Sequence, residues 1–368
     1  MNKKNLKIFN NSRVIVTGHT GFKGSWLTAW LKKLGAKVMG IALDPHTNPS
    51  HFKASQINKG IKDIRLDIRN SKKLEKKIIA FKPDFVFHLA AQATVGVSYM
   101  DPSLTWQSNV FGTLNILESL RKLKNKCNVV IITSDKCYFN KEIHYGYKET
   151  DVLGGKDPYS GSKASAEILI KSYVNSFFNN KSKIRIATAR AGNVIGGGDW
   201  TDNRIIPDCV RSWSKNKKVK LRNPNSTRPW QHVLEAVGGY LCLAINLEFN
   251  KKLHGESFNF GPNLTKEYSV LELVKTMGKH WRNVSWTRMP KSKKKYFESG
   301  LLRLNCKKAN KLLKWKTVLR FDELMGMVAD WYKHYYLNKK NALKITSKQI
   351  KKYESLAAKR GLHWTKIN

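Results

Sequence analysis

Cysteine is scarce in this chain of 368 residues. The five cysteines, Cys127, Cys137, Cys209, Cys242 and Cys306, are odd in number, widely spaced and free of any Cys-x-x-Cys pair. This pattern argues against a disulfide framework and against a structural zinc site, so we predict no metal centre. Cysteine usage of this kind is typical of a protein from a reducing compartment.

Long apolar runs are also missing. No stretch approaches the length of about 20 residues that a membrane-spanning helix needs. Residues 1–7 lack the apolar core of a secretory signal. A hydrophobic content of 41% with 11% aromatic residues still fits a folded globular protein. We therefore expect a soluble, cytoplasmic protein without a membrane partner.

Acidic residues are few, with 26 Asp and Glu against 68 Lys and Arg, which gives a formal net charge of +42. Such a charge raises nucleic acid or another polyanion as a partner. The lysines are scattered along the whole chain, however, without an arginine-rich arm, zinc-finger spacing or an RNA-binding aromatic signature. We favour a lysine-rich solvated surface, and keep nucleic-acid binding on a Rossmann scaffold as an alternative.

The first half of the chain alternates between β-branched apolar segments and amphipathic segments with helical spacing. This alternation predicts an α/β fold, a Rossmann-like doubly wound parallel sheet with helices on both faces. Helices are expected at residues 72–81, at 104–123 and from Pro158 onward. The expected strands cover residues 13–18, 37–43, 61–66, 84–90, 129–132 and 184–189.

After Asn193 the regular alternation fades, beginning with a glycine-rich segment at residues 196–200. We predict helices at residues 204–213, 232–246, 269–281 and 321–336, with short strands near 219–223 and 258–262. This half is interpreted as a smaller α+β substrate-binding lobe. The predicted domains are residues 1–192 with 231–260 for the Rossmann part, 193–230 with 261–337 for the lobe, and 338–368 for a basic C-terminal tail.

A glycine loop follows the first strand. Gly18, Gly21 and Gly24 lie between a strand and a helix, where glycines let the backbone approach a pyrophosphate at the helix N-terminus. Asp44 closes the second strand about 20 residues later, the position of a carboxylate that binds the ribose 2′-hydroxyl. It would repel a 2′-phosphate, so NAD is favoured over NADP. A turn aspartate before Pro45 is the alternative.

Tyr159 and Lys163 are four residues apart, so they share one face of the helix that begins at Pro158. A nearby ammonium would lower the pKa of the tyrosine and make it a base. The alternative is that Tyr159 and Lys163 are only neighbouring side chains on the surface of a helix, which would show the same spacing.

Ser134, Asp135 and Lys136 follow the strand at residues 129–132. The carboxyl end of a parallel strand faces the ligand crevice, so this segment brings a hydroxyl, an acid and an amine to it. The alternative interpretation of Asp135 and Lys136 is a buried salt bridge or a polar pair at the end of the strand.

Several segments together resemble a known family. The chain is similar to the CDP-glucose 4,6-dehydratases, which are extended short-chain dehydrogenases/reductases, from about residue 14 to about residue 331. The glycine loop and the Tyr159/Lys163 pair mark only the superfamily. The more specific strings are Thr-Ser-Asp-Lys-Cys-Tyr at residues 133–138, Gly-Gly-Gly-Asp-Trp at 196–200 and Arg-Pro-Trp-Gln-His at 228–232.

The resemblance implies conversion of CDP-glucose to CDP-4-keto-6-deoxyglucose with bound NAD. By this resemblance, Tyr159 removes the proton of the C4 hydroxyl and Ser134 forms a hydrogen bond with the C4 oxygen. Asp135 is the acid that protonates the C6 hydroxyl. Lys136 stands where related dehydratases commonly have a glutamate, and as a base it would need a lowered pKa. The alternatives are an epimerase or a 4,6-dehydratase acting on a GDP-, dTDP- or UDP-linked sugar.

The resemblance also implies cofactor and substrate contacts. Asp67 is expected at the adenine end of NAD, or as a cap for the following helix. At the positions of residues 93–96 the family tends to have Pro-Leu-Val-Arg. This chain has no lysine or arginine there, so a positive charge near the cofactor or substrate phosphates is missing. His232 is expected to be a core histidine. The cofactor contacts are Gly18, Thr20, Gly21, Phe22, Lys23, Gly24, Asp44, Asp67, Ile68, Ala90, Ala91, Gln92, Tyr159 and Lys163; the substrate contacts are Asn193, Arg204, Arg228 and Glu298.

Finally, the resemblance implies a homodimer. The helices at residues 104–123 and 158–178 would pair with their copies as a four-helix bundle beside Tyr159. They carry more apolar residues than one core face needs. These are Leu114, Ile116, Leu117, Leu120, Ala166, Ile168, Leu169 and Tyr173.

Overall fold

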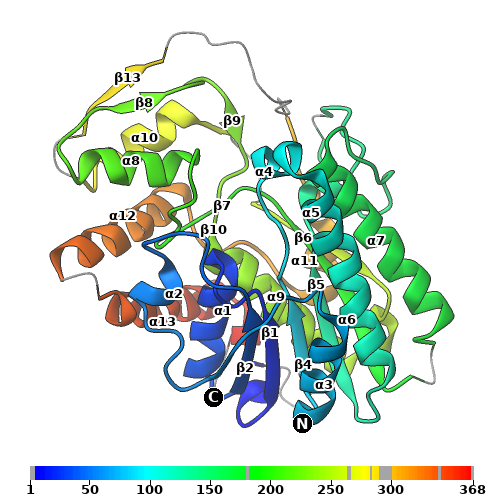
Figure 1. The fold of residues 1–368 in the computed structure, drawn as a ribbon. Coiled ribbons are helices and arrows are strands. Elements are labelled where there is room, and N and C mark those ends of the chain that lie inside the picture. Colours follow the sequence, from blue (N-terminus) through cyan, green and yellow to red (C-terminus); the bar gives the residue numbers. More distant parts are fainter. Residues whose placement is uncertain are drawn as a thin grey trace.

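A seven-stranded parallel sheet forms the centre of the protein (Figure 1). The computed structural model describes residues 5–143, 145–179, 182–262, 267–281, 284–289, 301–338 and 341–365. The strand order is β11-β6-β5-β4-β1-β2-β3. The strands are β1 Arg13–Thr17, β2 Lys37–Ala42, β3 Lys62–Arg65, β4 Phe85–His88, β5 Cys127–Ile132, β6 Ile184–Ala191 and β11 Ser257–Phe260.

Successive residues of the central strands point into two different cores, as strand geometry requires. Val14 and Val16 of β1 pack in the core that contains α1, Phe22–Lys33, and α9, Val233–Phe249. Ile15 packs on the opposite face, under helices α3, Ser71–Phe81, α6, Gly112–Arg121, and α7, Pro158–Ser176. The prediction of a doubly wound sheet is confirmed.

The segment predicted as one helix at residues 104–123 is interrupted. The chain forms α5, Pro102–Trp106, then a π-helical turn, η2, Gln107–Phe111, and then α6. Asn109 in this turn accepts a hydrogen bond from the Gln92 backbone N–H at 2.8 Å and donates to the hydroxyl of Ser162 on α7 at 2.9 Å. The π-helical turn therefore ties the end of β4 to the helix that carries Tyr159, a use typical of such turns.

After Asn193, α9 and β11 still belong to the sheet and its core, whereas other segments form a smaller lobe beside the sheet, with α8, β8, α10 and β13 at the upper left of Figure 1. Its strands are short and pair in twos, β7 with β10, β8 with β13, and β9 with β12. The elements are β7 Val194–Ile195, α8 Ile205–Trp213, β8 Val219–Leu221, β9 Thr227–Arg228, β10 Gln231–His232, β12 Tyr268–Ser269, α10 Val270–Gly278, β13 Trp286–Arg288 and α12 Phe321–Leu337.

The segment predicted as a basic tail is largely helix α13, Leu343–Lys359, and it packs on α1 and α12. Glu354 accepts a hydrogen bond from the indole N–H of Trp30 at 2.8 Å and pairs with Lys33 at 2.6 Å. Ile345, Ile350, Tyr353 and Ala357 are buried on one side. The many exposed lysines obscured this apolar stripe in the sequence. The predicted domain boundaries themselves stay a prediction.

The described residues contain no helix that is long and apolar enough to cross a bilayer. Within the same part of the chain, no cluster of three His, Cys, Asp or Glu side chains could hold a metal ion.

Several short helices were not predicted from the sequence. They are η1 Leu6–Phe9, α2 His51–Ala54, α4 Val95–Met100, η3 Asp135–Cys137, η4 Lys251–Leu253, α11 Lys307–Leu313 and η5 His363–Thr365.

Candidate active site

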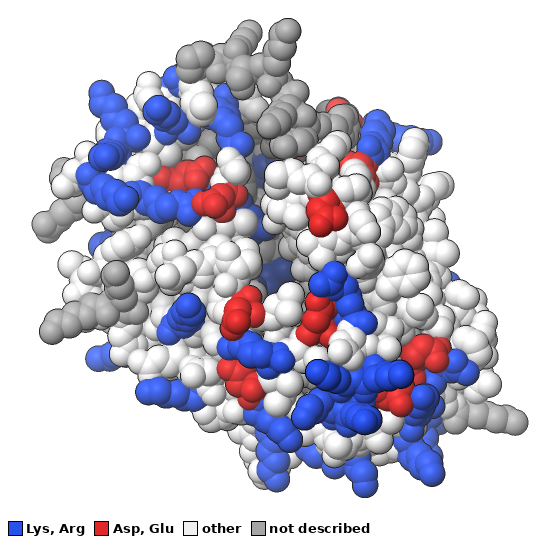
Figure 2. Space-filling view, in the orientation of Figure 1, with Lys and Arg blue, Asp and Glu red and all other residues white. Residues whose placement is uncertain are grey.

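A crevice lies at the carboxyl ends of the strands, where the strand order reverses between β1 and β4. Ligands bind at such switch points in open α/β sheets. Figure 2 shows a furrow between the smaller lobe and the sheet half, with Lys or Arg side chains visible in its depth. The predicted site residues can therefore be followed from one end of this crevice to the other.

The glycine loop forms the floor of the crevice. Gly18 has φ +73°, and a Cβ placed there would lie 2.7 Å from the backbone nitrogen of Ala90. A Cβ on Gly24 would lie 2.1 Å from the carbonyl oxygen of Gly18. Only glycine fits at both positions, and Gly21 is the N-cap of α1. The hydroxyl of Thr20 donates to the carbonyl oxygen of Leu43 at 2.9 Å, which ties the loop to the end of β2.

At the far end of this loop, two aspartates lie at the surface, and each pairs with an arginine. Asp44 is 86% exposed and lies 3.1 Å from the guanidinium of Arg65. Asp67 pairs with Arg69 at 2.6 Å. Asp67 does not cap α3, because the side chain of Asn70 does so.

Four further predicted cofactor contacts follow strands β3 and β4, Ile68 after β3 and the other three after β4. Ile68 turns its side chain into the core against Gly112. Ala90 touches the glycine loop, and Ala91 follows it, half-buried. The side chain of Gln92 donates to Thr105 at 2.8 Å. The apolar side chain of Ile68 therefore packs in the core, whereas Ala90 lies against Gly18 of the glycine loop.

Tyr159 and Ser134 meet at the other end of the crevice. Tyr159 lies in the first turn of α7 and is buried. Burial raises the pKa of Tyr159 to about 12, although its hydrogen bond with Ser134 and the positive charge of Arg204 oppose the rise. Burial, followed by the like charge of Lys23, lowers the pKa of Lys163 to about 8. The prediction that the pKa of Tyr159 falls below its ordinary value is wrong for the protein alone, because burial outweighs the favourable contacts.

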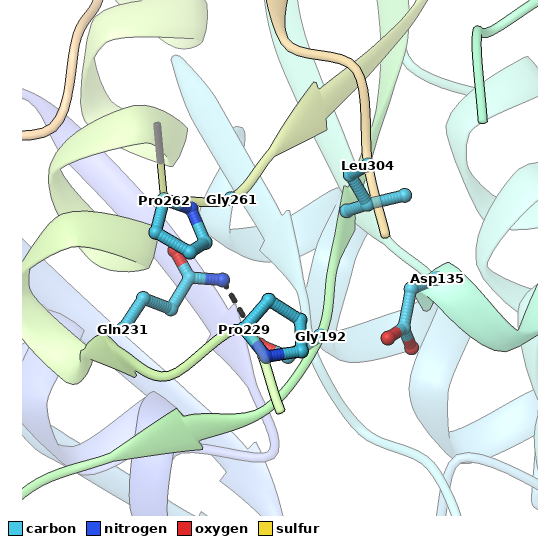
Figure 3. Close-up of a pocket in the computed structure, with 7 residues that line it drawn as sticks. All are labelled: Asp135, Gly192, Pro229, Gln231, Gly261, Pro262 and Leu304. Carbon is cyan, nitrogen blue, oxygen red and sulfur yellow. Dashed lines mark hydrogen bonds between the residues drawn. The ribbon is translucent and has the colours of Figure 1, made fainter. Parts of the chain in front are cut away.

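Asp135 is brought together with this pair. The Ser134 hydroxyl donates to the Asp135 carboxylate at 2.9 Å, which places Ser134 between the acid and the Tyr159 phenol. Asp135 is buried, and a Cβ on Gly192 would lie 2.0 Å from its carboxylate oxygen. Figure 3 shows the carboxylate at a small hollow. The hollow is lined by Asp135, Gly192, Pro229, Gln231, Gly261, Pro262 and Leu304.

Lys136 lies in the same turn, η3, but lines a neighbouring hollow together with Asp157 and Ser160. Both Asp135 and Lys136 are among the described residues, and no ion pair joins them there. The alternative of a buried salt bridge between these neighbours is thus not what the structure contains. The two side chains belong to adjacent hollows.

Lys23 reaches the catalytic end, which its predicted role in cofactor binding did not anticipate. Its ammonium lies 3.4 Å from the hydroxyl of Tyr240. Burial and then the charge of Arg204 lower its pKa to about 8, while Asp135 opposes this change. A lysine one residue after the start of a glycine-loop helix carries no sequence signal for this contact, because Tyr240 lies 217 residues away.

The predicted substrate residues are distributed over the lobe. Asn193 follows β6 with φ +30°. Arg204 pairs with Asp199 at 2.9 Å and interacts electrostatically with Tyr159. Arg228, on β9, donates to the carbonyl oxygen of Thr227 at 2.8 Å. Glu298 lies outside the described residues.

The core assignment of His232 is confirmed. The ring is fully buried, and its Nδ1 accepts a hydrogen bond from the backbone N–H of Leu234 at 3.2 Å. Burial lowers its pKa to about 3, so the ring is neutral. His232 therefore caps α9 from within the core.

A buried ion pair beneath the catalytic turn was missed by sequence reasoning. Arg190 of β6 donates to both carboxylate oxygens of Glu167, at 3.0 and 2.8 Å, one helical turn after Lys163. Arg190 also donates to the hydroxyl of Tyr138 at 2.8 Å. Thr133 and Thr188 donate to the same carboxylate. This network joins α7 to the ends of β5 and β6, and so holds Tyr159 and Ser134 in register.

Comparison with known proteins adds to this geometry. The family model described as GDP-mannose 4,6 dehydratase matches residues 15–328. A CDP-glucose 4,6-dehydratase of Salmonella typhimurium is 42% identical over 352 residues, an alignment that covers 94% of this chain and 97% of that protein.

Solved structures show the same fold. The epimerase Mth375 of Methanothermobacter thermautotrophicus matches with a TM-score of 0.77 at 21% identity, covering 91% of this chain and 96% of that one. UDP-glucuronic acid 4-epimerase of Bacillus cereus, in complex with UDP-glucuronic acid and NAD, matches with a TM-score of 0.73 at 22% identity, covering 88% of this chain and 100% of that one. The predicted Rossmann-like architecture is thus shared with sugar-nucleotide epimerases.

Proposed function

Since the chain belongs to the GDP-mannose 4,6 dehydratase family, we propose that it is a CDP-glucose 4,6-dehydratase, a hydro-lyase that forms CDP-4-keto-6-deoxyglucose. The observation that carries this function is the hydrogen-bonded series Tyr159, Ser134 and Asp135 at the carboxyl end of β5. An epimerase needs the tyrosine and the serine for oxidation at C4. A dehydratase also needs an acid at C6, and Asp135 supplies one.

The protein side chains divide the chemistry among themselves. Tyr159 takes the proton of the C4 hydroxyl while Ser134 holds the C4 oxygen. The phenol must be deprotonated to act, so binding of the ligands has to lower its pKa from about 12. When bound, NAD would accept the hydride from C4 and return it to C6. With a ketone at C4, a base removes the C5 proton and Asp135 protonates the C6 hydroxyl, which leaves as water. The C5 carbon regains a proton when hydride reaches C6, so the reaction is redox-neutral.

The base for C5 is proposed to be Lys136. It follows the acid directly in η3 and lines a hollow of its own with Asp157 and Ser160. Its amine must be neutral to act as a base. Arg204 and Arg228 are proposed to bind the diphosphate, because guanidinium groups bind phosphate bidentately. Asn193 is proposed to contact the substrate beside them.

The cofactor is proposed to be NAD. The tightly packed loop of Gly18, Gly21 and Gly24 opens onto the N-terminus of α1, which suits a pyrophosphate. Asp44 is exposed at the end of β2, where a ribose hydroxyl would be bound. Because the B. cereus epimerase of the same fold contains NAD, this assignment is also consistent with the comparison.

A homodimer through α6 and α7 is proposed as the assembly. Four of the apolar residues invoked from the sequence, Ile116, Leu117, Leu120 and Ala166, are buried in the protein's own core. Other apolar residues on α7 or on the segments next to these two helices are exposed. Ile168 of α7 is 59% exposed, Phe111 of η2 55%, Phe177 after α7 46% and Trp106 of α5 38%. Exposed apolar residues of this kind favour an interface. A mass of one chain by light scattering at physiological salt, with full activity, would refute the dimer.

The decisive experiment offers the protein glucose linked to CDP, UDP, GDP and dTDP, with NAD present, and follows the products by mass spectrometry. We expect a product lighter by one water from the CDP sugar. A product of unchanged mass and altered configuration would support the epimerase alternative. Loss of water from another nucleotide sugar only would overturn the assignment to CDP-glucose.

A further inference from the structure

Arg65 and Asp44 meet at the point where the ribose of the cofactor is expected. Arg65 ends β3 and lies in register with Ala42 of β2, two residues before Asp44. Both side chains therefore lie at the carboxyl edge of the sheet. The guanidinium Nε is 3.1 Å from the Asp44 carboxylate. Any group on the ribose 2′ position that contacts Asp44 also comes within reach of Arg65.

The guanidinium of Arg65 is held in place independently of Asp44. A second nitrogen donates to Asp63 at 3.0 Å, and the guanidinium stacks over the ring of Phe52 at 4.9 Å. Asp63 in turn contacts the ring of His19 at 2.8 Å, in the turn after Gly18. The arginine is thus tied to the glycine loop and would keep its position if Asp44 were removed.

We propose that Arg65 is a binding site for a 2′-phosphate, and that Asp44 masks it. This inference rests on the proposed nicotinamide-dependent function and adds a determinant of cofactor choice. With Asp44 and Asp63 beside Arg65, the triad carries a net charge of −1, which favours a neutral ribose hydroxyl over a phosphate. Without Asp44 the net charge is zero, and a planar guanidinium then faces the 2′ position. Guanidinium groups bind phosphate bidentately.

The arrangement also explains how one carboxylate can serve two partners in the NAD complex. A carboxylate has about four acceptor positions on its two oxygens, so Asp44 can accept from Arg65 and from a ribose hydroxyl together. In wild type, Arg65 thus lessens the repulsion that Asp44 exerts on NADP. Removing Arg65 alone should make the protein discriminate more strongly against NADP.

The test is a double-mutant cycle on the cofactor-free full chain, with binding of NAD and of NADP measured by calorimetry. Asp44→Ala should shift the ratio of the two dissociation constants toward NADP by about ten-fold or more, the effect of one charge-assisted contact. Adding Arg65→Ala should abolish most of that gain. Equal shifts in the presence and absence of Arg65 would overturn the proposal, because repulsion by Asp44 alone would then explain them.

A matched control is Arg13→Ala. Arg13 also pairs with an exposed aspartate, Asp84, at 3.2 Å, but it lies at the opposite end of β1. It removes the same charge without touching the crevice, so both dissociation constants should stay unchanged. Circular dichroism verifies that each variant folds. If the wild-type protein bound neither NAD nor NADP, the proposed function and this inference would both fail. If it bound NAD but the effects of the Asp44 and Arg65 substitutions on the NAD/NADP ratio were independent, only this inference would be refuted.

Discussion

The two ends of the crevice handle charge in opposite ways. At the catalytic end, Tyr159, Asp135 and the ion pair of Glu167 and Arg190 are buried. At the ribose end, Asp44 and Asp67 lie at the surface, where water and salt screen their partners. Burial shifts pKa values and makes an ion pair costly to break, whereas exposed pairs contribute little stability. The catalytic end should therefore govern rate and stability, and the ribose end should govern affinity and cofactor choice.

The largest effect is expected from Tyr159→Phe. Loss of the phenolic oxygen removes the base for C4 oxidation and should lower kcat by about a thousand-fold, within the range for general acid–base groups. Folding and NAD affinity should stay near wild type. Tyr145→Phe is the control, because Tyr145 is 71% exposed. Turnover close to wild type in the Tyr159 variant would remove the tyrosine from the mechanism.

The second largest effect is expected from breaking the buried ion pair of Glu167 and Arg190. Glu167→Gln leaves Arg190 with an uncompensated buried charge and should lower the free energy of unfolding by about 3–5 kcal/mol. Glu75→Gln removes a comparable but exposed pair with Lys122, and should change it by less than about 1 kcal/mol. Denaturant titration measures both. Equal losses would contradict the contrast between buried and exposed charge.

Asp135→Asn should stall elimination while sparing C4 oxidation. The carboxamide cannot donate a proton to the departing C6 hydroxyl, so kcat should fall by about a hundred-fold or more. Reduced cofactor should accumulate in a single turnover, followed by absorbance. Asp330→Asn, on the exposed side of α12, should behave as wild type. If oxidation itself were lost, Asp135 would position the substrate and not act as the acid.

Lys23 interacts electrostatically with Lys163, and its removal should be detectable in the pH profile of kcat. Its positive charge contributes to the lowered pKa of Lys163, after burial. Lys23→Met should therefore raise the pKa of Lys163 above its value of about 8, and the kcat limb that reports Lys163 should move to higher pH. Lys37→Met, at the exposed start of β2, should leave the limb in place. An unmoved limb in the Lys23 variant would show that the two ammonium groups do not interact.

The smallest effect is expected from salt at the ribose end. Wild type should bind NAD more tightly than NADP because of Asp44. Raising the salt concentration from about 0.05 to about 0.5 M should reduce that preference, since the screening length falls below about 5 Å. The buried pair of Glu167 and Arg190 should respond far less. Calorimetry at both salt concentrations tests the comparison, and equal affinities at low salt would mean that Asp44 does not meet the ribose.

Much of the fold could be predicted because it depends on local periodicity. The β-branched runs that became β1, β5 and β6 were located within a few residues, since buried parallel strands are apolar on both faces. Ser134, Asp135 and Tyr159 were grouped correctly because strand ends and helix starts meet at one edge of such a sheet.

What could not be predicted depends on contacts between distant residues or on burial. No sequence pattern pairs Glu167 with Arg190, because the two residues lie 23 positions apart on different elements. The raised pKa of Tyr159 reflects how deeply the ring is enclosed, which spacing does not reveal. The division of Asp135 and Lys136 between two hollows depends on the turn of η3. Helix α13 was missed because its lysines outnumbered the apolar residues of its buried stripe.

The contact between α1 and α13 bears on how the protein folds during synthesis. Trp30 and Glu354 are 324 residues apart, yet their hydrogen bond joins the helix that carries the glycine loop to a helix made very late. Domains on the ribosome generally fold in the order in which they emerge. Here the outer face of α1, with Trp30 and Lys33, stays uncovered until residues 343–359 have been translated. A nascent chain would thus expose this face of α1 to chaperones until α13 has been made.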